Sequence, residues 1–282
     1  MRRVVLTLSC PDRIGIVAAV ANVLLQQRCN IVDSAQFGDA TNQRFFMRVC
    51  FDADERATVA ALAAAFAPVT EDFGMQSRFY DVHVKSRVLI LVSKFGHCLN
   101  DLLYRFRVGS LPVEIPAIAS NHRDFERLAG AHDIPFVHLP VQPANRAEQE
   151  AKLRTFIDSE RIDLVVLARY MQVLSPALCA HLRSRAINIH HSFLPSFQGA
   201  RPYQQAHARG VKLIGATAHY VTEDLDEGPI IEQDVVRVHH AMDPDDYVEV
   251  GRDVESTVLA RAVKWHVEHR VLLNDARTVV FR

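Results

Sequence analysis

The sequence predicts an α/β protein with two domains: a small ferredoxin-like domain, followed by a doubly wound, mostly parallel Rossmann-like domain. Three observations support this prediction. About eighty residues at the N-terminus alternate between strand-like and helical patterns in the order β-α-β-β-α-β. The run 88–92 is continuously apolar, which is typical of a parallel strand buried on both faces. After it, short apolar strands alternate with helical stretches, as in a doubly wound sheet.

The first domain is expected over residues 1–84. Its first helix is indicated by Ile14, Val17, Val20 and Leu24, which recur at helical spacing. A turn-rich segment, 38–42, joins two of its strands. The expected strands cover 3–9, 30–37, 43–51 and 73–82, and the expected helices cover 13–27 and 55–67.

The second domain is expected over residues 85–282. After the strand at 88–92, further strands are expected over 111–119, 135–139, 163–168 and 186–190, then a hairpin of 212–221 and 229–237 and a long helix over 244–270. Doubly wound sheets bind ligands outside the carboxyl ends of their strands. The end of the strand at 186–190 is therefore the expected position of a functional site.

Composition excludes several classes of function. The 282 residues are 49% hydrophobic and 23% charged, as expected of a soluble globular protein. A formal net charge of −1 offers no electrostatic footprint for nucleic acid or an anionic membrane. Five scattered cysteines without a C-x-x-C pair favour a cytoplasmic location over a disulfide framework or a structural zinc site. Pro11 interrupts the N-terminal apolar run too early for a signal peptide.

Four polar residues at the expected site suit attack on a carbonyl carbon. Asn188 and His190 are two apart on a strand, so both side chains leave the same face. His219 and Asp226 flank a second break in the chain, and both can point back toward the same cavity. An amide can stabilise an oxyanion, an imidazole can move a proton, and a carboxylate can hold the nucleophile.

Simpler interpretations exist for each of these residues. Taken alone, His190 and His219 could be packed histidines, and Asp226 could be a solvated turn residue. Two histidines and a carboxylate could also form a metal triad, but an asparagine in first position suits an oxyanion better than a cation, so no metal is expected. Cys98 beside His97 invites a thiol-nucleophile interpretation that has no third orienting group in the sequence.

The same motifs resemble those of the folate-dependent formyl-transfer family. The run Asn188-Ile189-His190, with Leu194-Pro195 behind it, is similar to the catalytic strand and loop of that family, and the runs 216–222 and 225–231 are similar to its folate loop. The resemblance implies catalytic positions for Asn188, His190 and Asp226, with His219 in support. The segment 168–175 resembles the wall of the pterin pocket. The implied substrate-binding residues are Tyr170, Met171, Gln172, Val173, Leu174 and Leu225.

The N-terminal residues resemble an ACT domain, a small-molecule-sensing module, through Cys10–Gly15 and Asn30–Val32. An ACT module in front of a formyl-transfer domain resembles the branch of the family that hydrolyses 10-formyltetrahydrofolate. The runs 92–99 and 197–203 strengthen that likeness, and Lys94, Phe95 and His97 replace the phosphate loop of the purine-pathway transferases.

The resemblance implies hydrolysis of 10-formyltetrahydrofolate to formate and tetrahydrofolate, which supplies formate for purine synthesis and balances folate pools. No separate cofactor is expected. A homo-oligomer is expected, with methionine or glycine as candidate effectors near Asp12, Gly15 and Asn30. Two alternatives remain: transfer of the formyl group to an amine, and a sensing protein whose second domain is catalytically idle.

Overall fold

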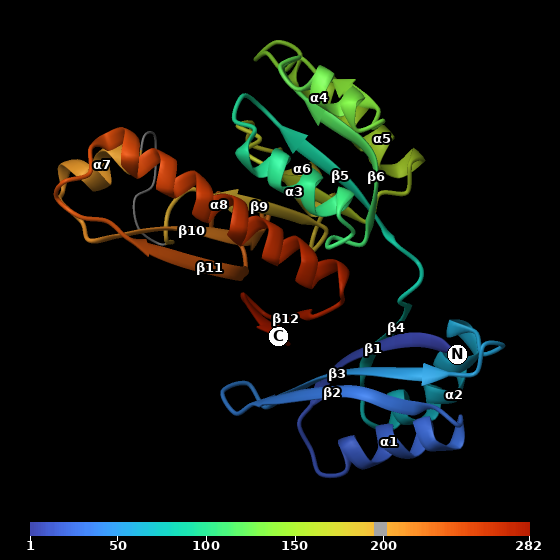
Figure 1. The fold of residues 1–282 in the computed structure, drawn as a ribbon. Helices are drawn as coiled ribbons and strands as arrows, with labels where there is room; N and C mark the ends of the chain where they lie inside the picture. The colour runs from blue at the N-terminus through green and yellow to red at the C-terminus, as the bar shows by residue number, and fades with distance from the viewer. Residues whose placement is uncertain (195–201) are drawn as a thin grey trace. The chain divides into compact units, whose positions relative to one another are not determined.

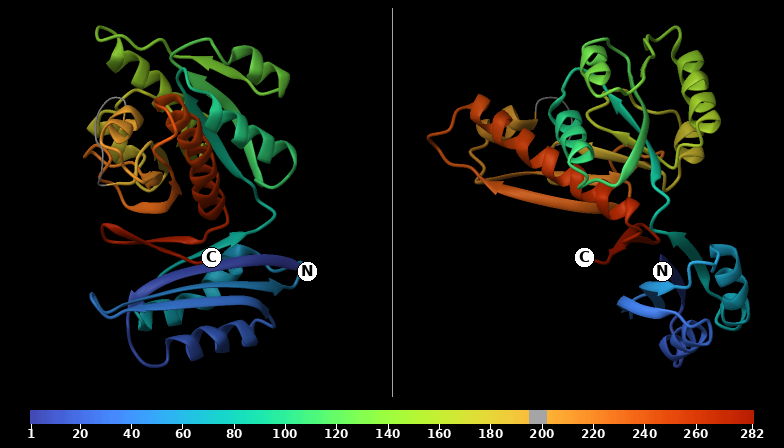
Figure 2. Two further views of the ribbon diagram at one scale, coloured as in Figure 1. Left: turned by 60° about the vertical axis from the view of Figure 1, so that its left-hand side comes forward. Right: turned by 45° about the vertical axis from the view of Figure 1, so that its right-hand side comes forward.

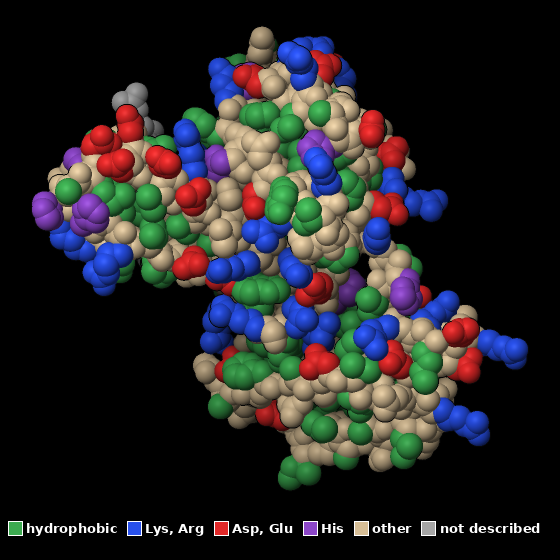
Figure 3. Space-filling view, viewed as in Figure 1, with side chains coloured by type: hydrophobic (Ala, Val, Ile, Leu, Met, Phe, Trp, Pro, Cys, Tyr) green, Lys and Arg blue, Asp and Glu red, His purple; other side chains and the backbone are tan. Residues whose placement is uncertain are grey.

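The computed structural model describes residues 1–194 and 202–282, so Pro195 and the motif residues 197–201 lie outside the described residues. The chain forms two compact units, one made of Met1–Lys85 and Glu268–Arg282 and the other of Ser86–Val267 (Figure 1). Acidic and basic side chains are interspersed over the face drawn in Figure 3, in keeping with the net charge of −1. None of the described helices combines the length and the apolar character that a bilayer span needs.

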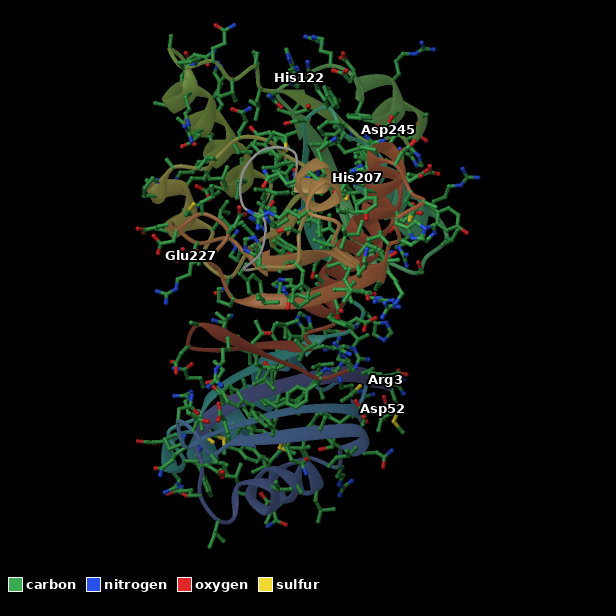
Figure 4. The ribbon with its side chains drawn as sticks, turned by 90° about the vertical axis from the view of Figure 1, so that its left-hand side faces the viewer. Arg3, Asp52, His122, His207, Glu227 and Asp245 are labelled. Carbon is green, nitrogen blue, oxygen red and sulfur yellow. The ribbon has the colours of Figure 1, made fainter. Side chains whose placement is uncertain are left out.

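The first unit contains the predicted β-α-β-β-α-β order. Its elements are β1 (Arg2–Pro11), α1 (Ile16–Gln26), β2 (Asn30–Asp39), β3 (Arg44–Ala53), α2 (Val59–Asp72) and β4 (Gln76–Asp81). The strands form an antiparallel sheet in the order β2-β3-β1-β4, and both helices cover one face of it (Figure 2). Val4, Leu6 and Leu8 alternate along β1 and pack against that helical layer, as a half-buried strand requires. Arg3 and Asp52, opposite each other on β1 and β3, form an ion pair with Nε and Oδ1 2.9 Å apart (Figure 4).

The C-terminal segment differs from the prediction. The long helix α8 (Pro244–Val267) ends at residue 267, and a hairpin of β12 (Val271–Asn274) and β13 (Arg277–Val280) follows it. Residues from Glu268 onward, which the sequence analysis placed in the second domain, belong to the first unit. The His269 ring stacks on Tyr80 at 3.5 Å between centroids, on the sheet face that the helices leave open. That apolar and aromatic contact explains why the segment groups with the first unit.

The second unit is the predicted doubly wound domain. Its helices are α3 (His97–Arg107), α4 (Glu126–Ala131), α5 (Arg146–Ser159), α6 (Pro176–His181), α7 (Pro202–Ala208) and α8. Its strands are β5 (Ser86–Val92), β6 (Val113–Ser120), β7 (Phe136–His138), β8 (Leu164–Leu167), β9 (Ala186–His190), β10 (Leu213–Tyr220) and β11 (Ile230–Arg237). The sheet order is β11-β10-β9-β8-β5-β6-β7, which confirms the predicted fold class.

Strand direction decides where this sheet can bind a ligand. β5 to β9 are parallel, whereas β10 pairs antiparallel with β9 and β11. Leu89 and Leu91 of β5 share a core with α5 and α6, and α8 packs across β9, β10 and β11 (Figure 1). Helices cover both faces of the parallel part of the sheet. A ligand is therefore expected outside the carboxyl ends of β8 and β9, as the sequence analysis predicted.

Candidate active site

A pocket opens at the carboxyl ends of β8 and β9. It has a volume of about 240 Å³ and lies wholly within the second unit. The four predicted catalytic residues and the six predicted substrate-binding residues all line it: Asn188, His190, His219, Asp226, Tyr170, Met171, Gln172, Val173, Leu174 and Leu225. Residues from three separate parts of the chain are therefore brought to one cavity.

Pairing of β9 with β10 places three of the polar side chains. Asn188 and His190 both project from β9, and His219 of β10 lies directly opposite Asn188 in the antiparallel register. Residues opposite each other across two strands share a face of the sheet. The register therefore sets His219 beside the amide of Asn188, with 3.3 Å between its Nε2 and the amide Nδ2.

The turn between β10 and β11 places Asp226. This residue adopts a left-handed backbone (φ 60°), which an aspartate tolerates better than most residues. Gly228, two residues later, has no room for a side chain, because a Cβ there would lie 1.7 Å from the carbonyl oxygen of Tyr220. The backbone N–H of Tyr220 donates to the carbonyl of Pro229 and closes the turn. This close approach returns the Asp226 carboxylate to the sheet.

The Asp226 carboxylate is the centre of the polar cluster. Its Oδ2 lies 3.0 Å from Nδ1 of His190, and its Oδ1 lies 3.5 Å from Nε2 of His219 and accepts a 3.3 Å hydrogen bond from Asn188. Burial alone would raise the pKa of the Asp226 carboxyl, but hydrogen bonds and charge from the two histidines outweigh burial and hold that pKa well below its usual range. The carboxylate is therefore ionised at neutral pH.

The second ring nitrogen of His190 is buried. The side chain is 6% exposed, and Nε2 has no hydrogen-bond partner among the residues that the structure describes. A buried nitrogen in this state is costly unless a ligand or water completes it. The arrangement is a carboxylate–imidazole pair on a residue that lines the pocket, next to an amide donor. Such a group can move a proton and stabilise an oxyanion on one carbon.

Comparison with known proteins matches both units. A formyl transferase family model matches residues 86–263, and an ACT domain model matches residues 4–67. A formyltetrahydrofolate deformylase of Corynebacterium sp. is 50% identical over 99% of this chain and 98% of its own length. The chain belongs to the formyltetrahydrofolate deformylase family. The crystal structure of a family member from Burkholderia mallei has a TM-score of 0.95 at 54% identity and covers all of both chains.

The transferase branch is more distant from this deformylase-family chain. A glycinamide ribonucleotide transformylase from Symbiobacterium toebii has a TM-score of 0.65 at 30% identity, and the match covers 71% of this chain and 95% of that one. That match omits a large part of this chain, whereas the deformylase matches extend over both units. Full-length coverage therefore favours the hydrolase branch over the amine-dependent alternative.

The predicted substrate-binding residues of this family member include both buried and exposed side chains. Tyr170 and Leu174 are buried and build the floor of the pocket. Met171, Val173 and Leu225 are more than half exposed, and all three line the same pocket. Their exposure at a pocket rim is what an apolar, flat ligand would cover.

The predicted effector residues do not lie together within one chain of this family member. Asp12 donates its backbone N–H to Gln43 and lies beside Gly38, at the far end of β2. Asn30 starts β2 and pairs with Asp52, roughly 26 Å from Gly38 at the usual rise per residue. Gly15, with φ 100°, precedes α1, close in sequence to Asp12. Within one chain the length of β2 separates Asn30 from Asp12 and Gly15, and the effector site near these residues stays a prediction.

Two features of the site escaped the sequence analysis. His191 follows His190 directly and also lines the pocket, because strand pairing and strict alternation end at His190. Thr217, fully buried on β10, holds the loop after β9: its hydroxyl donates to Ser192 and accepts the backbone N–H of Leu194. A threonine in a strand carries no sequence signal of such a role.

The alternatives based on metal or thiol chemistry can be compared with the geometry. Among the described residues, His97, Cys98 and Glu255 are the group of three potential metal ligands whose atoms lie within 4.8 Å of one another. Arg169 lies 3.4 Å from the same Glu255 carboxylate and competes with a cation there. Burial, followed by the charge of Glu255, strongly raises the pKa of the Cys98 thiol. A neutral, buried thiol is a poor nucleophile and a poor ligand.

Proposed function

We propose that this chain hydrolyses 10-formyltetrahydrofolate to formate and tetrahydrofolate, with the formyl carbon beside Asn188, His190 and Asp226. Membership of the deformylase family supports this function. The observation that carries it is the pairing of His190, which lines the pocket: its Nδ1 contacts an ionised Asp226, and its buried Nε2 has no hydrogen-bond partner among the described residues.

The proposed reaction has two steps. Water attacks the formyl carbon and gives its proton to Nε2 of His190, whose developing charge is stabilised by Asp226. The imidazolium then returns this proton to the folate nitrogen as the C–N bond breaks, and the departing formic acid loses water's second proton to solvent to give formate. His190 suits this role better than Asp226, because both oxygens of Asp226 already contact the side chains around them.

Asn188 supplies the oxyanion donor in this mechanism. Its amide contacts to His219 and Asp226 are both 3.3 Å long, so one N–H can turn to the substrate oxygen when the pocket fills. His219 keeps its place because its Nδ1 contacts the carbonyl of Tyr220 at 2.9 Å. The proposed reaction needs no cofactor, and we expect dialysis against a chelator to leave its rate unchanged.

The test is formate release from 10-formyltetrahydrofolate by the purified chain with every amine acceptor omitted. Stoichiometric formate and tetrahydrofolate support hydrolysis. Turnover that appears only after an amine is added would assign the chain to the transferase class. Formate release that a chelator abolishes and a divalent ion restores would assign a metal mechanism instead.

The N-terminal unit is proposed to bind a small-molecule effector, by its match to the ACT domain. By the same family resemblance the effector is an amino acid, with methionine and glycine as candidates, and the chain works as a homo-oligomer. Formate release measured with each amino acid added singly tests the first point, and sedimentation tests the second.

A further inference from the structure

A group of buried polar side chains lies behind the proposed catalytic residues. Its centre is Glu255 of α8, which is 1% exposed. One carboxylate oxygen lies 2.7 Å from Nε2 of His97, at the start of α3, and the other accepts a 2.5 Å hydrogen bond from the hydroxyl of Tyr203 on α7. Burial alone would raise the pKa of the Glu255 carboxyl, but hydrogen bonds and charge from its partners, His97 first, outweigh burial and lower it. Glu255 is therefore a buried anion that three elements surround.

Arg169 connects this anion to the pocket. It follows β8 in a left-handed backbone conformation (φ 64°), and its carbonyl accepts the backbone N–H of Ser93 at 3.2 Å. The guanidinium Nε lies 3.4 Å from Glu255, and Nη1 lies 2.5 Å from Nδ1 of His191. Met171, two residues later, donates its N–H to the Ser93 hydroxyl, so Ser93 holds the backbone of this bend at two points.

The contact with Arg169 determines the proton position on His191. A guanidinium only donates hydrogen bonds, so Nδ1 of His191 must accept, and the neutral ring carries its proton on Nε2. The His191 ring stacks on that of His190, with centroids 4.9 Å apart and planes at 18°. The orientation of the proposed proton carrier is thus limited on one side by Asp226 and on the other by His191.

We propose that Glu255 is a positioning residue for this reaction. It holds the guanidinium of Arg169, which holds His191 in one tautomer and one plane, and the stacked ring of His191 fixes the plane of His190. The inference rests on the proposed hydrolysis, since His190 is the residue that it positions. Glu255 is not among the residues that line the pocket, so it acts through Arg169 and not on the substrate.

The first test replaces Glu255 by glutamine, which keeps its shape and removes its charge. We expect kcat to fall roughly 10- to 100-fold with KM within about threefold of wild type, because a displaced proton carrier slows chemistry more than binding. Glu249→Gln, the same change at an exposed position of α8, is the matched control and should leave both constants unchanged. A folded Glu255→Gln variant with wild-type kcat overturns the proposal.

A double variant separates positioning from folding. Glu255→Gln leaves the Arg169 cation without its buried counter-charge, and that loss by itself destabilises a fold. Glu255→Gln combined with Arg169→Met removes both charges, so we expect its thermal stability to return toward wild type while kcat stays low. Recovery of kcat together with stability would show that Glu255 only neutralises Arg169, and the proposal would fail. This comparison remains decisive even where the single variant does not fold.

Nitrogen-15 NMR of the histidine rings tests the tautomer directly. We expect His191 of the wild type to carry its proton on Nε2, and Glu255→Gln to give a mixture of tautomers; His191→Gln assigns the signals. A proton on Nδ1 in the wild type, or an unchanged tautomer in the variant, contradicts the proposal. This readout needs no turnover, so a wild type that releases no formate refutes the proposed function without deciding the tautomer.

Discussion

Asp226 shows how one carboxylate can organise a site. With a histidine at each oxygen and a pKa held below its usual range, it contributes a fixed negative charge at neutral pH. Loss of that charge leaves the imidazolium formed during the proposed reaction without a counter-ion. The same loss removes the contact that holds Nδ1 of His190, so the orientation of the imidazole and the stabilisation of its charge are lost together.

The first prediction concerns Asp226→Asn. We expect kcat for formate release to fall by about 10²–10³, as for other single losses of transition-state electrostatics. Glu227→Gln is the control, since Glu227 is an exposed neighbour in the same turn that does not line the pocket (Figure 4). Steady-state formate assays on both variants are the measurement. Near-normal turnover of Asp226→Asn would remove the carboxylate from the mechanism.

A second prediction concerns His266 and the pH dependence of stability. Burial lowers the pKa of this imidazole to about 4, against a smaller opposing effect of Asp163, and Nδ1 lies 2.7 Å from the Tyr220 hydroxyl. The unfolded chain binds a proton at this residue below about pH 6.5, whereas the folded chain does so only near pH 4. The stabilising contribution is therefore complete above pH 6.5 and is lost as the pH falls to 4.

Denaturant unfolding between pH 4 and pH 7 measures this effect. His266 should account for roughly 2 to 3 kcal/mol of the fall in unfolding free energy. His266→Gln, which cannot titrate, should show a correspondingly flatter curve over the same range. Parallel curves for the two proteins would mean that His266 is not held neutral.

At the scale of single residues, the sequence predicted the side chains that line the pocket but not Glu255, which supports them. Asn188 and His190 are two apart on a strand, and this spacing alone predicts a shared face. Glu255 has no comparable signal, because an acidic residue on a helix rich in charged residues resembles a solvated face. Its burial depends on α3 and α7, which are far away in the sequence, so only the packed structure identifies it.

The decisive element is the turn between β10 and β11, which the sequence predicted correctly as a break in a hairpin. The sequence did not reveal how closely the chain passes itself there. Gly228 contacts the backbone of Tyr220, and Asp226 takes a left-handed conformation two residues earlier. An acidic turn with one glycine is common in proteins, and only the packing shows that this glycine sets the position of the carboxylate.

The third prediction concerns Gly228→Ala. A methyl group at Gly228 meets the Tyr220 carbonyl, so the turn must move and carry Asp226 away from His190. We expect kcat to fall at least 100-fold, since misplacements of about 1 Å have effects of this size. Gly210→Ala is the control: it has a positive φ of 62° but no atom within 4 Å of its Cβ, so it should cost only about 1 kcal/mol of stability. Equal activities of the two variants would contradict this role of the turn.

At the scale of the whole molecule, the chain does not follow a simple order of two domains. The first unit uses residues from both ends of the sequence, and the second unit lies between them in the chain. The sequence contains a signal for the last hairpin: 271–280 has two apolar runs separated by Asn274-Asp275-Ala276-Arg277, a turn-forming composition. Which unit the hairpin joins cannot be predicted from local pattern, because that depends on contacts with residues more than 200 positions away.

Those contacts centre on Asp39, a buried carboxylate at the end of β2. Asn274 donates to it at 2.7 Å and accepts a 2.6 Å hydrogen bond from Asn42, while Arg277 reaches the same carboxylate from an exposed position. A hydrogen bond from Thr41 and that from Asn274 lower the pKa of the Asp39 carboxyl. The buried amide thus links the two ends of the chain within one unit.

The last prediction follows from the difference between the two donors. Asn274→Ala removes the buried donor to Asp39 and one of the two acceptors of the Asn42 amide, so we expect it to lower the unfolding free energy of the first unit by about 1–3 kcal/mol. Arg277→Ala removes a solvent-exposed ion pair to the same carboxylate and should cost less than about 1 kcal/mol. Hydrogen exchange of the β2 and β3 amides reports the first unit separately, and formate release reports the second, where neither variant should change kcat. A larger loss of protection in Arg277→Ala than in Asn274→Ala would show that charge at the surface, and not the buried amide, holds the C-terminal hairpin.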